Sequence, residues 1–157
     1  MLMDTTRHFT PNQYTNGLES WDFLKLKGKT PFLASAFGDV FFTARNGVWF
    51  LDTVGGTLER ICRKEADLKG TLDSQAGREK YLMTELVLAA EDAGLVPVGD
   101  QVLDYTIAPA LGGPVNVSNL SVLDFVVKLN VAGQIRGQIR RMKPGTLISG
   151  VSINEKA

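Results

Sequence analysis

The chain has 157 residues, with 44% hydrophobic side chains and 17 basic against 17 acidic ones, as expected for one globular domain. A formal net charge of zero argues against a partner bound mainly by charge, such as a nucleic acid or a membrane surface. The single cysteine, Cys62, excludes an intramolecular disulfide and a cysteine zinc site. We expect a cytoplasmic protein, because the sequence shows no signal peptide and no apolar run near the ~20 residues of a membrane span.

Residues 1–16 are polar and aperiodic, which predicts a flexible tail before a single domain over residues 17–157. The only histidine, His8, lies in this tail, so we do not expect a Ser/His/Asp or Cys/His catalytic site. In residues 17–28, the spacing of Leu18, Trp21 and Leu24 predicts a short helix.

Residues from about 31 to 62 predict an antiparallel meander of four strands. Three dipeptides suit two-residue hairpin loops, and they are Gly38-Asp39, Asn46-Gly47 and Gly55-Gly56. Runs of aromatic and β-branched residues lie between them. Both faces of the meander are apolar in the middle, so we expect helices or another layer on each face.

Two-residue loops at these dipeptides would place Asp52 opposite Glu59, with Asp39 near the same end of the meander. Such a carboxylate cluster could bind a metal or act in acid–base catalysis, but three residues supply few oxygens for a hard cation. The simpler interpretation is a turn residue and two solvated strand ends. A third is an acidic patch that meets a basic partner. We expect no metal site and no cofactor.

After a short helix over residues 63–72, a stripe of Leu82, Leu86, Ala89 and Ala93 predicts a helix at about 75–93. A short strand is expected at 102–107. Residues 109–114 then form a rigid turn, which lacks the lysine and hydroxyl residue of a phosphate loop.

The last helix is expected at about 121–142, opened by a capping-box variant at Ser121 and Asp124. Arg136 falls where the apolar stripe would continue, so this end of the helix either is exposed or meets a partner. Residues 146–153 suggest a last strand. The expected fold class is therefore α+β, with the meander packed by the helices at 75–93 and 121–142.

Four segments together resemble one family: Ala36–Phe42, Gly47–Ile61, Pro109–Val127 and Ala132–Thr146. The family is the C-terminal domain of type VI secretion immunity proteins that neutralise a DNase toxin, formerly a domain of unknown function. The resemblance covers Trp21 to Ile153. It implies a non-enzymatic bacterial protein of the cytoplasm that binds a cognate secreted toxin and blocks it.

The resemblance also suggests roles for individual residues. Because a DNA-cutting toxin has a basic cleft, the partner-binding candidates are Asp39, Asp52 and Glu59, together with Arg136. Arg136 stands where the family has the histidine of a Gly-Gln-Ile-His pattern. The motif residues expected to be structural are Gly38, Gly47, Gly56, Gly112, Gly113 and Gln134. Better-known members carry an additional N-terminal domain that has no counterpart in this sequence.

A stand-alone domain that binds a small ligand, with the turn at residues 109–114 as the rim of its pocket, is the competing hypothesis. An enzyme ranks third, since no nucleophile–base pair is evident. The sequence leaves open the identity of the toxin, the contact surface and the oligomeric state.

Overall fold

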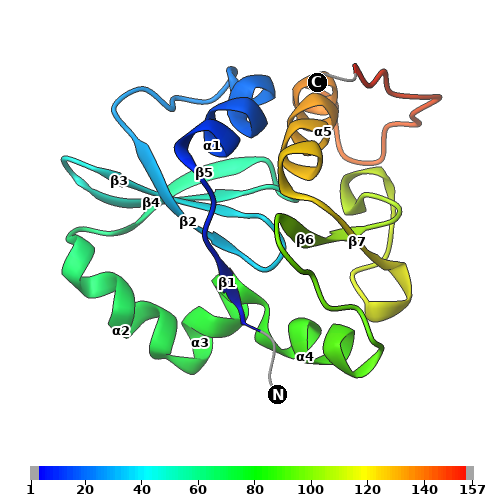
Figure 1. Ribbon diagram of the computed structural model, residues 1–157. Helices are drawn as coiled ribbons and strands as arrows, with labels where there is room; N and C mark the ends of the chain where they lie inside the picture. The colour runs from blue at the N-terminus through cyan, green and yellow to red at the C-terminus, as the bar shows by residue number, and fades with distance from the viewer. Residues whose placement is uncertain (1–3, 155–157) are drawn as a thin grey trace.

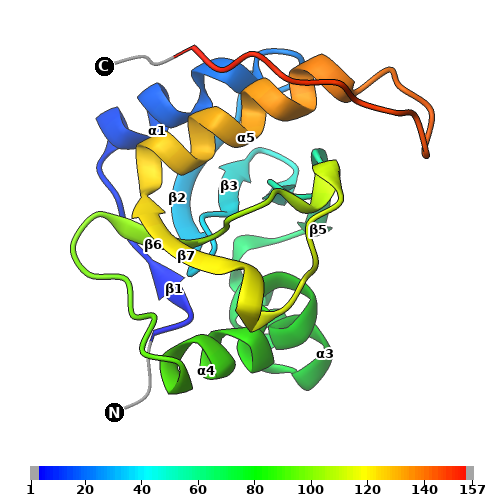
Figure 2. The ribbon, with the colours of Figure 1, turned by 90° about the vertical axis from the view of Figure 1, so that its right-hand side faces the viewer.

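The computed structural model describes residues 4–154, and its elements form three layers (Figures 1 and 2). An antiparallel sheet in the order β1-β2-β3-β4-β5 is the middle layer. Its strands are β1 (Thr6–Arg7), β2 (Thr30–Ser35), β3 (Val40–Ala44), β4 (Gly47–Asp52) and β5 (Thr57–Cys62). A second, two-stranded sheet pairs β6 (Gln101–Tyr105) with β7 (Leu120–Asp124). The fold is α+β as predicted, but the meander of four strands gains β1 as a fifth.

Two groups of helices enclose the sheet. The first contains α1 (Pro11–Leu18), η1 (Glu19–Trp21) and α5 (Phe125–Ile139). The second contains η2 (Glu65–Asp67), α2 (Leu68–Asp73), α3 (Gln75–Gly77), the π-helical η3 (Arg78–Leu82) and α4 (Thr84–Asp92). Two short 3₁₀ turns, η4 (Pro109–Leu111) and η5 (Val117–Asn119), lie in the β6–β7 connection. No helix within residues 4–154 is long and apolar enough to cross a membrane.

Both faces of the meander are buried, as its alternating apolar residues predict. Val40, Phe42 and Leu51 share one core cluster with residues of the first helical group. Phe41, Val48 and Phe50 share another with residues of the second group. The alternation of the strands therefore assigns these residues to the correct faces.

The predicted register was wrong by two residues. Thr43 pairs with Val48 and Phe50 with Glu59. The β3–β4 loop is Arg45-Asn46, because the left-handed residue is Gly47 (φ 130°), which already belongs to β4. Each face nevertheless keeps its residues, since a shift of two preserves the period of a strand.

The prediction of a flexible tail over residues 1–16 was wrong for the described part, residues 4–16; residues 1–3 lie outside the described range. Thr10 and Gln13 form a reciprocal capping box at the start of α1, with Pro11 in the first turn. The ring of Phe9 stacks on Phe125 at 3.7 Å between centroids, and Tyr14 packs against Phe125 edge-on. The predicted helix at 17–28 is replaced by α1 and η1, which end at Trp21.

The helix predicted at 75–93 is interrupted at Met83, whose left-handed backbone (φ 52°) separates η3 from α4. The helix predicted at 121–142 begins later, at Phe125, because residues 120–124 pair with β6 as strand β7. Asp124 caps this helix by accepting the N–H of Val127 at 3.1 Å. Residues 146–153 form no strand and return along α5 instead.

Candidate functional site

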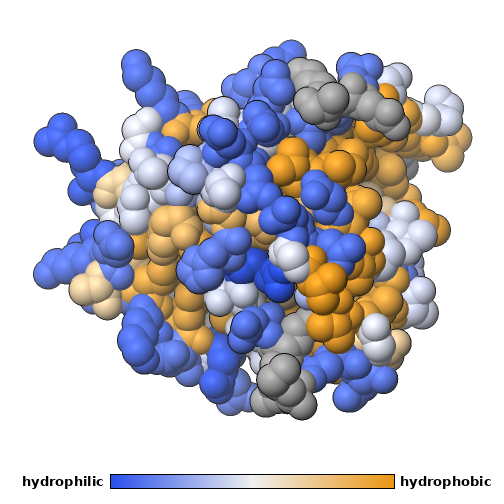
Figure 3. Space-filling view, viewed as in Figure 1, coloured by the Kyte–Doolittle hydropathy of each residue, from blue (hydrophilic) through white to orange (hydrophobic). Residues whose placement is uncertain are grey.

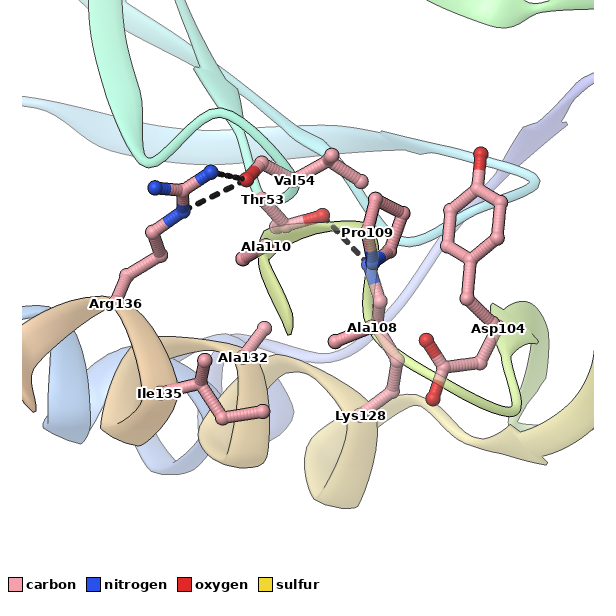
Figure 4. A pocket seen from close by; sticks show the side chains of 11 residues that line it. Thr53, Val54, Asp104, Ala108, Pro109, Ala110, Lys128, Ala132, Ile135 and Arg136 are labelled. Carbon is pink, nitrogen blue, oxygen red and sulfur yellow. Dashed lines mark hydrogen bonds between the residues drawn. The ribbon is translucent and has the colours of Figure 1, made fainter. Parts of the chain in front are cut away.

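The four segments that resemble the family meet at the loop between β4 and β5, residues 53–56. We use the name turn site for this loop and the five side chains around it: Asp39, Asp104, Tyr105, Lys128 and Arg136. The close-up in Figure 4 shows the loop facing α5 and the turn at Pro109. A cavity of about 30 Å³ lies between them. Its walls come from the β4–β5 loop, β6, the β6–β7 connection and α5, so segments far apart in the sequence converge here.

A buried chain of hydrogen bonds lies beneath the turn site. The Lys128 ammonium, on a side chain only 4% exposed, donates to the Phe37 carbonyl and to Thr53 Oγ1, both at 2.6 Å. Thr53 Oγ1 in turn donates to Asp39 Oδ1 at 2.6 Å, and the Thr53 N–H donates to the same oxygen at 2.9 Å. Ser35 Oγ donates to Asp39 Oδ2 at 3.1 Å. A lysine and an aspartate therefore lock the β2–β3 and β4–β5 loops to α5.

Three carboxylates act on Tyr105 at the edge of this chain. Burial and the nearby charges of Asp39, Asp52 and Asp104 raise the pKa of the Tyr105 phenol. Burial also raises the pKa of the Asp104 carboxyl, and the Lys128 ammonium partly offsets that shift. The phenol of Tyr105 therefore stays protonated at neutral pH and cannot serve as a base.

Arg136 holds the outer side of the loop. Its guanidinium donates from Nε to the Val54 carbonyl at 2.7 Å and also from Nη2 to the same oxygen. A Cβ added to Gly56, whose φ is 70°, would lie 2.7 Å from Arg136 Cδ. The arginine therefore packs on Gly56, whose positive φ favours glycine, and connects α5 to the loop.

The predicted acidic cluster does not form. Asp39 is 6% exposed, and both of its carboxylate oxygens accept hydrogen bonds in the buried chain. Asp52 accepts the N–H groups of Val54 and Gly55, both at 3.0 Å, and so shapes the loop. Glu59 lies further along β5, exposed, 3.7 Å from the Lys80 ammonium. The register is the cause, since it pairs Asp52 with Thr57 and leaves Glu59 opposite Phe50.

The other motif residues serve the backbone. A Cβ on Gly47 would lie 2.0 Å from the Cys62 carbonyl oxygen, and one on Gly113 would lie 1.8 Å from the Ile107 carbonyl oxygen. Gly112 ends η4 with a φ of 98°. Gly38, with a φ of 79°, places the loop against the Lys128 side chain. Gln134 lies away from the turn site, on another face of α5, where it binds backbone groups of Asn154.

Sequence reasoning missed Lys128, Thr53 and Asp104. A signal for Lys128 was present, because it lies three residues after Phe125 and next to Leu129, within the apolar stripe of the predicted helix. A lysine in that position needs buried partners. No pattern in the sequence identifies Thr53 as one of them.

The described residues contain no group of three or more His, Cys, Asp or Glu side chains that could hold a metal ion. The cavity of about 30 Å³ has room for one water molecule, whereas small-molecule sites are typically roughly 300–1,000 Å³. The cavity at the turn site is therefore too small for an organic ligand, and the hydrogen bonds around it hold the loop in place.

The carboxyl of Asp104 should make stability depend on pH. Because its pKa is raised, the folded protein holds this proton more tightly than the unfolded chain does. That stabilisation is present at acid pH and is lost as the pH rises through the raised pKa. D104N should therefore gain stability relative to wild type between about pH 4 and about pH 7, measured by urea unfolding. A relative stability that falls over this range would contradict the expected sign.

No protein-family model matches the sequence, and no curated protein matches it. Among solved structures, the chain is similar to the "Crystal structure of Atu4351 from Agrobacterium tumefaciens", with a TM-score of 0.60 and 16% sequence identity. The match covers 83% of this chain and 66% of that one, so this chain spans just under two thirds of its relative. At this identity the likeness shows a shared fold.

Proposed function

We propose that the protein is a non-enzymatic immunity protein that acts in the bacterial cytoplasm, where it binds a cognate secreted toxin, of the DNase class, and blocks it. The observation that carries the proposal is the convergence at the turn site. Three of the four family-like segments contribute residues to it, namely Asp39 from the first, Thr53 from the second and Arg136 from the fourth. The third segment contributes Pro109 to the wall of the adjoining cavity. The segments that resemble the family therefore lie close together in the folded protein.

The chemistry of the turn site supports binding over catalysis. Lys128 and Asp39 are buried, and both bind the Thr53 hydroxyl. Arg136 binds the backbone carbonyl of Val54. A general acid or base must reach a substrate proton, and a nucleophile must be paired with such a base. The described residues offer no pair of that kind in the cavity.

The toxin-facing surface that we favour is the exposed edge strand β5 beside the loop, with Glu59 as its acidic contact. Asp39 is excluded by burial, and Asp52 already caps its own loop. On the β6–β7 side, Figure 3 shows apolar side chains at the surface, and Ile107 and Val115 are more than half exposed there. An acidic contact on β5, on a protein that also exposes apolar residues, suits a basic protein partner better than it suits a nucleic acid.

The small-ligand alternative has one supporting observation, the turn at Pro109 that lines the cavity. Its size argues against it, because about 30 Å³ accommodates a water molecule and no organic ligand. This alternative would return if a metabolite co-purified with the protein.

The function is tested by using the tagged protein as bait in the bacterium that encodes it, with mass spectrometry of the captured partners. We expect a stoichiometric partner with a nuclease or other toxin domain. E59K should weaken its capture at low salt by about tenfold, because the change reverses a charge without breaking the fold. E65K, the same change at another exposed glutamate, in η2, is the matched control. Equal capture by E59K and E65K would remove Glu59 from the contact surface, and no toxin among the partners would contradict the function.

A further inference from the structure

The end of the described chain is held to α5 by two glutamines. Beyond Ile139 the chain turns back, and Figure 2 shows it running along the outer side of α5 toward the start of that helix. Gln138 donates to the Ser152 carbonyl at 2.6 Å and accepts the Ser152 N–H at 2.9 Å. Gln134 donates to the Asn154 carbonyl at 2.8 Å and accepts the Asn154 N–H at 2.6 Å. We call this pair of side chains the glutamine ladder.

The ladder matches the repeat of an extended peptide. An extended residue presents its N–H and its C=O on the same side, and one primary amide can pair with both. Residues four apart on a helix are about 6.0 Å apart along its axis, and alternate residues of an extended strand are about 6.6 Å apart. Glutamines at 134 and 138 therefore bind alternate residues of an antiparallel strand, at positions 154 and 152.

The side chain of Gln134 is held in place by a second residue of α5, Asn130. Gln134 Nε2 also donates to Asn130 Oδ1 at 2.7 Å, and Asn130 Nδ2 donates to the Asn16 carbonyl at 3.2 Å. Asn130 is buried between α1 and α5. The Gln134 amide is therefore oriented by the body of the protein and does not depend on the segment that it binds.

The side chains of the bound segment, residues 152–154, contribute little to its binding. All four bonds use backbone atoms of Ser152 and Asn154, so they do not depend on which side chains the segment carries. Residues 152–154 are all exposed, and none belongs to a core cluster. Exposed hydrogen bonds without burial open readily, so another extended segment can take this place.

A groove of about 450 Å³ lies beside the ladder, between η1 and α5. Phe23 and Gly137 provide apolar surface, and Glu19 and Asp22 stand on the η1 side. Arg140, which lies over the Phe23 ring, also lines the groove. A competing segment can fill this groove with its side chains, which the chain's own segment leaves largely open. The two carboxylates outnumber the one arginine, so the groove favours basic side chains.

We propose that the glutamine ladder is a binding site for an extended, basic segment of a partner protein, and that residues 152–154 occupy it until that partner displaces them. The identity of the partner as a toxin rests on the proposed function, and for a toxin the ladder is a second contact, separate from the one at Glu59. Main-chain pairing of this type provides affinity, and the adjacent groove provides specificity.

The test uses the full-length chain with its own segment released. S152P/N154P removes both N–H donors, whereas I153P, the matched control, removes an N–H that has no partner among the described residues. The first probe is the synthetic peptide Leu-Ile-Ser-Gly-Val-Ser-Ile-Asn, identical to residues 147–154 and labelled for fluorescence anisotropy. The second probe carries lysine at the positions of Ser152 and Asn154, which line the groove. It should bind more tightly than the first, and weaker binding would overturn the basic character of the occupant. S152P/N154P should bind the first peptide at least about tenfold more tightly than wild type or I153P, because the site is no longer occupied.

Two further reagents isolate the ladder. Adding Q134A/Q138A to S152P/N154P should abolish peptide binding, and so should N-methylation of the peptide at the positions of Ser152 and Asn154. Circular dichroism shows whether each variant is folded. A folded S152P/N154P that fails to bind the peptide would overturn the proposal, as would binding that survives the loss of both glutamines. No toxin enters this experiment, so its outcome is separate from that of the proposed function.

Discussion

Replacing Lys128 with alanine is expected to destabilise the protein by about 3–5 kcal/mol, because a buried carboxylate then loses its cation. Among residues 4–154, the Lys128 ammonium is the only charged donor bonded to the buried chain of Thr53 and Asp39, and Lys128 is 4% exposed. Urea unfolding followed by circular dichroism gives the change in the free energy of unfolding. A loss below about 1 kcal/mol would contradict the structural role of Lys128.

The matched control for Lys128 separates charge from packing. K128M keeps most of the side-chain volume but removes the charge, and K128M/D39N removes both buried charges. The double variant should be more stable than the sum of the two single changes predicts, since each single change leaves one charge without its counterpart. Additive losses would indicate that Lys128 and Asp39 are not coupled through Thr53.

Replacing Gly47 with alanine is the second large expected effect, a loss of about 3 kcal/mol or failure to fold. Its φ of 130° is open to glycine, and a Cβ would lie 2.0 Å from the Cys62 carbonyl oxygen. The clash is with backbone of β5, so it can be relieved only by separating β4 from β5 at that end. Thermal unfolding of the purified variant measures the loss.

Gly70 provides the control for Gly47. It lies within α2, it has no atom within 4 Å of an added Cβ, and its φ is not positive. G70A should therefore be neutral or stabilise the protein by up to about 1 kcal/mol, through the helix propensity of alanine. If G70A and G47A cost the same, the effect at Gly47 is not one of close approach.

The faces of the meander could be predicted because successive residues of a strand point to opposite faces, so Phe41 and Phe50 face away from their neighbours in sequence. A register shift of two residues leaves each residue on the same face. The register itself could not be predicted, because it depends on the backbone of the loops. A two-residue loop was expected at Asn46-Gly47, but of these two residues only Gly47 has a positive φ. The carboxylate of Asp52 widens the next loop to residues 53–56. That shift also dispersed the expected acidic cluster.

The helices show the same division between local pattern and tertiary context. The stripe around Leu86 predicted a helix, but nothing local marks the left-handed residue Met83 that interrupts it. Leu120 and Val122 fit a helix or a strand by spacing, and pairing with β6 decided for the strand. Thr10 and Gln13 did carry a capping-box signal within the segment expected to be a tail.

Titration of the captured toxin with the purified protein tests most directly whether this is an immunity protein. Toxin activity is measured on its own substrate, DNA cleavage for a DNase, against increasing amounts of the protein. The proposed function predicts that activity falls linearly and is abolished near a molar ratio of about one, as expected for tight binding. Full toxin activity in the presence of excess folded protein would contradict it, even if the two proteins co-purify.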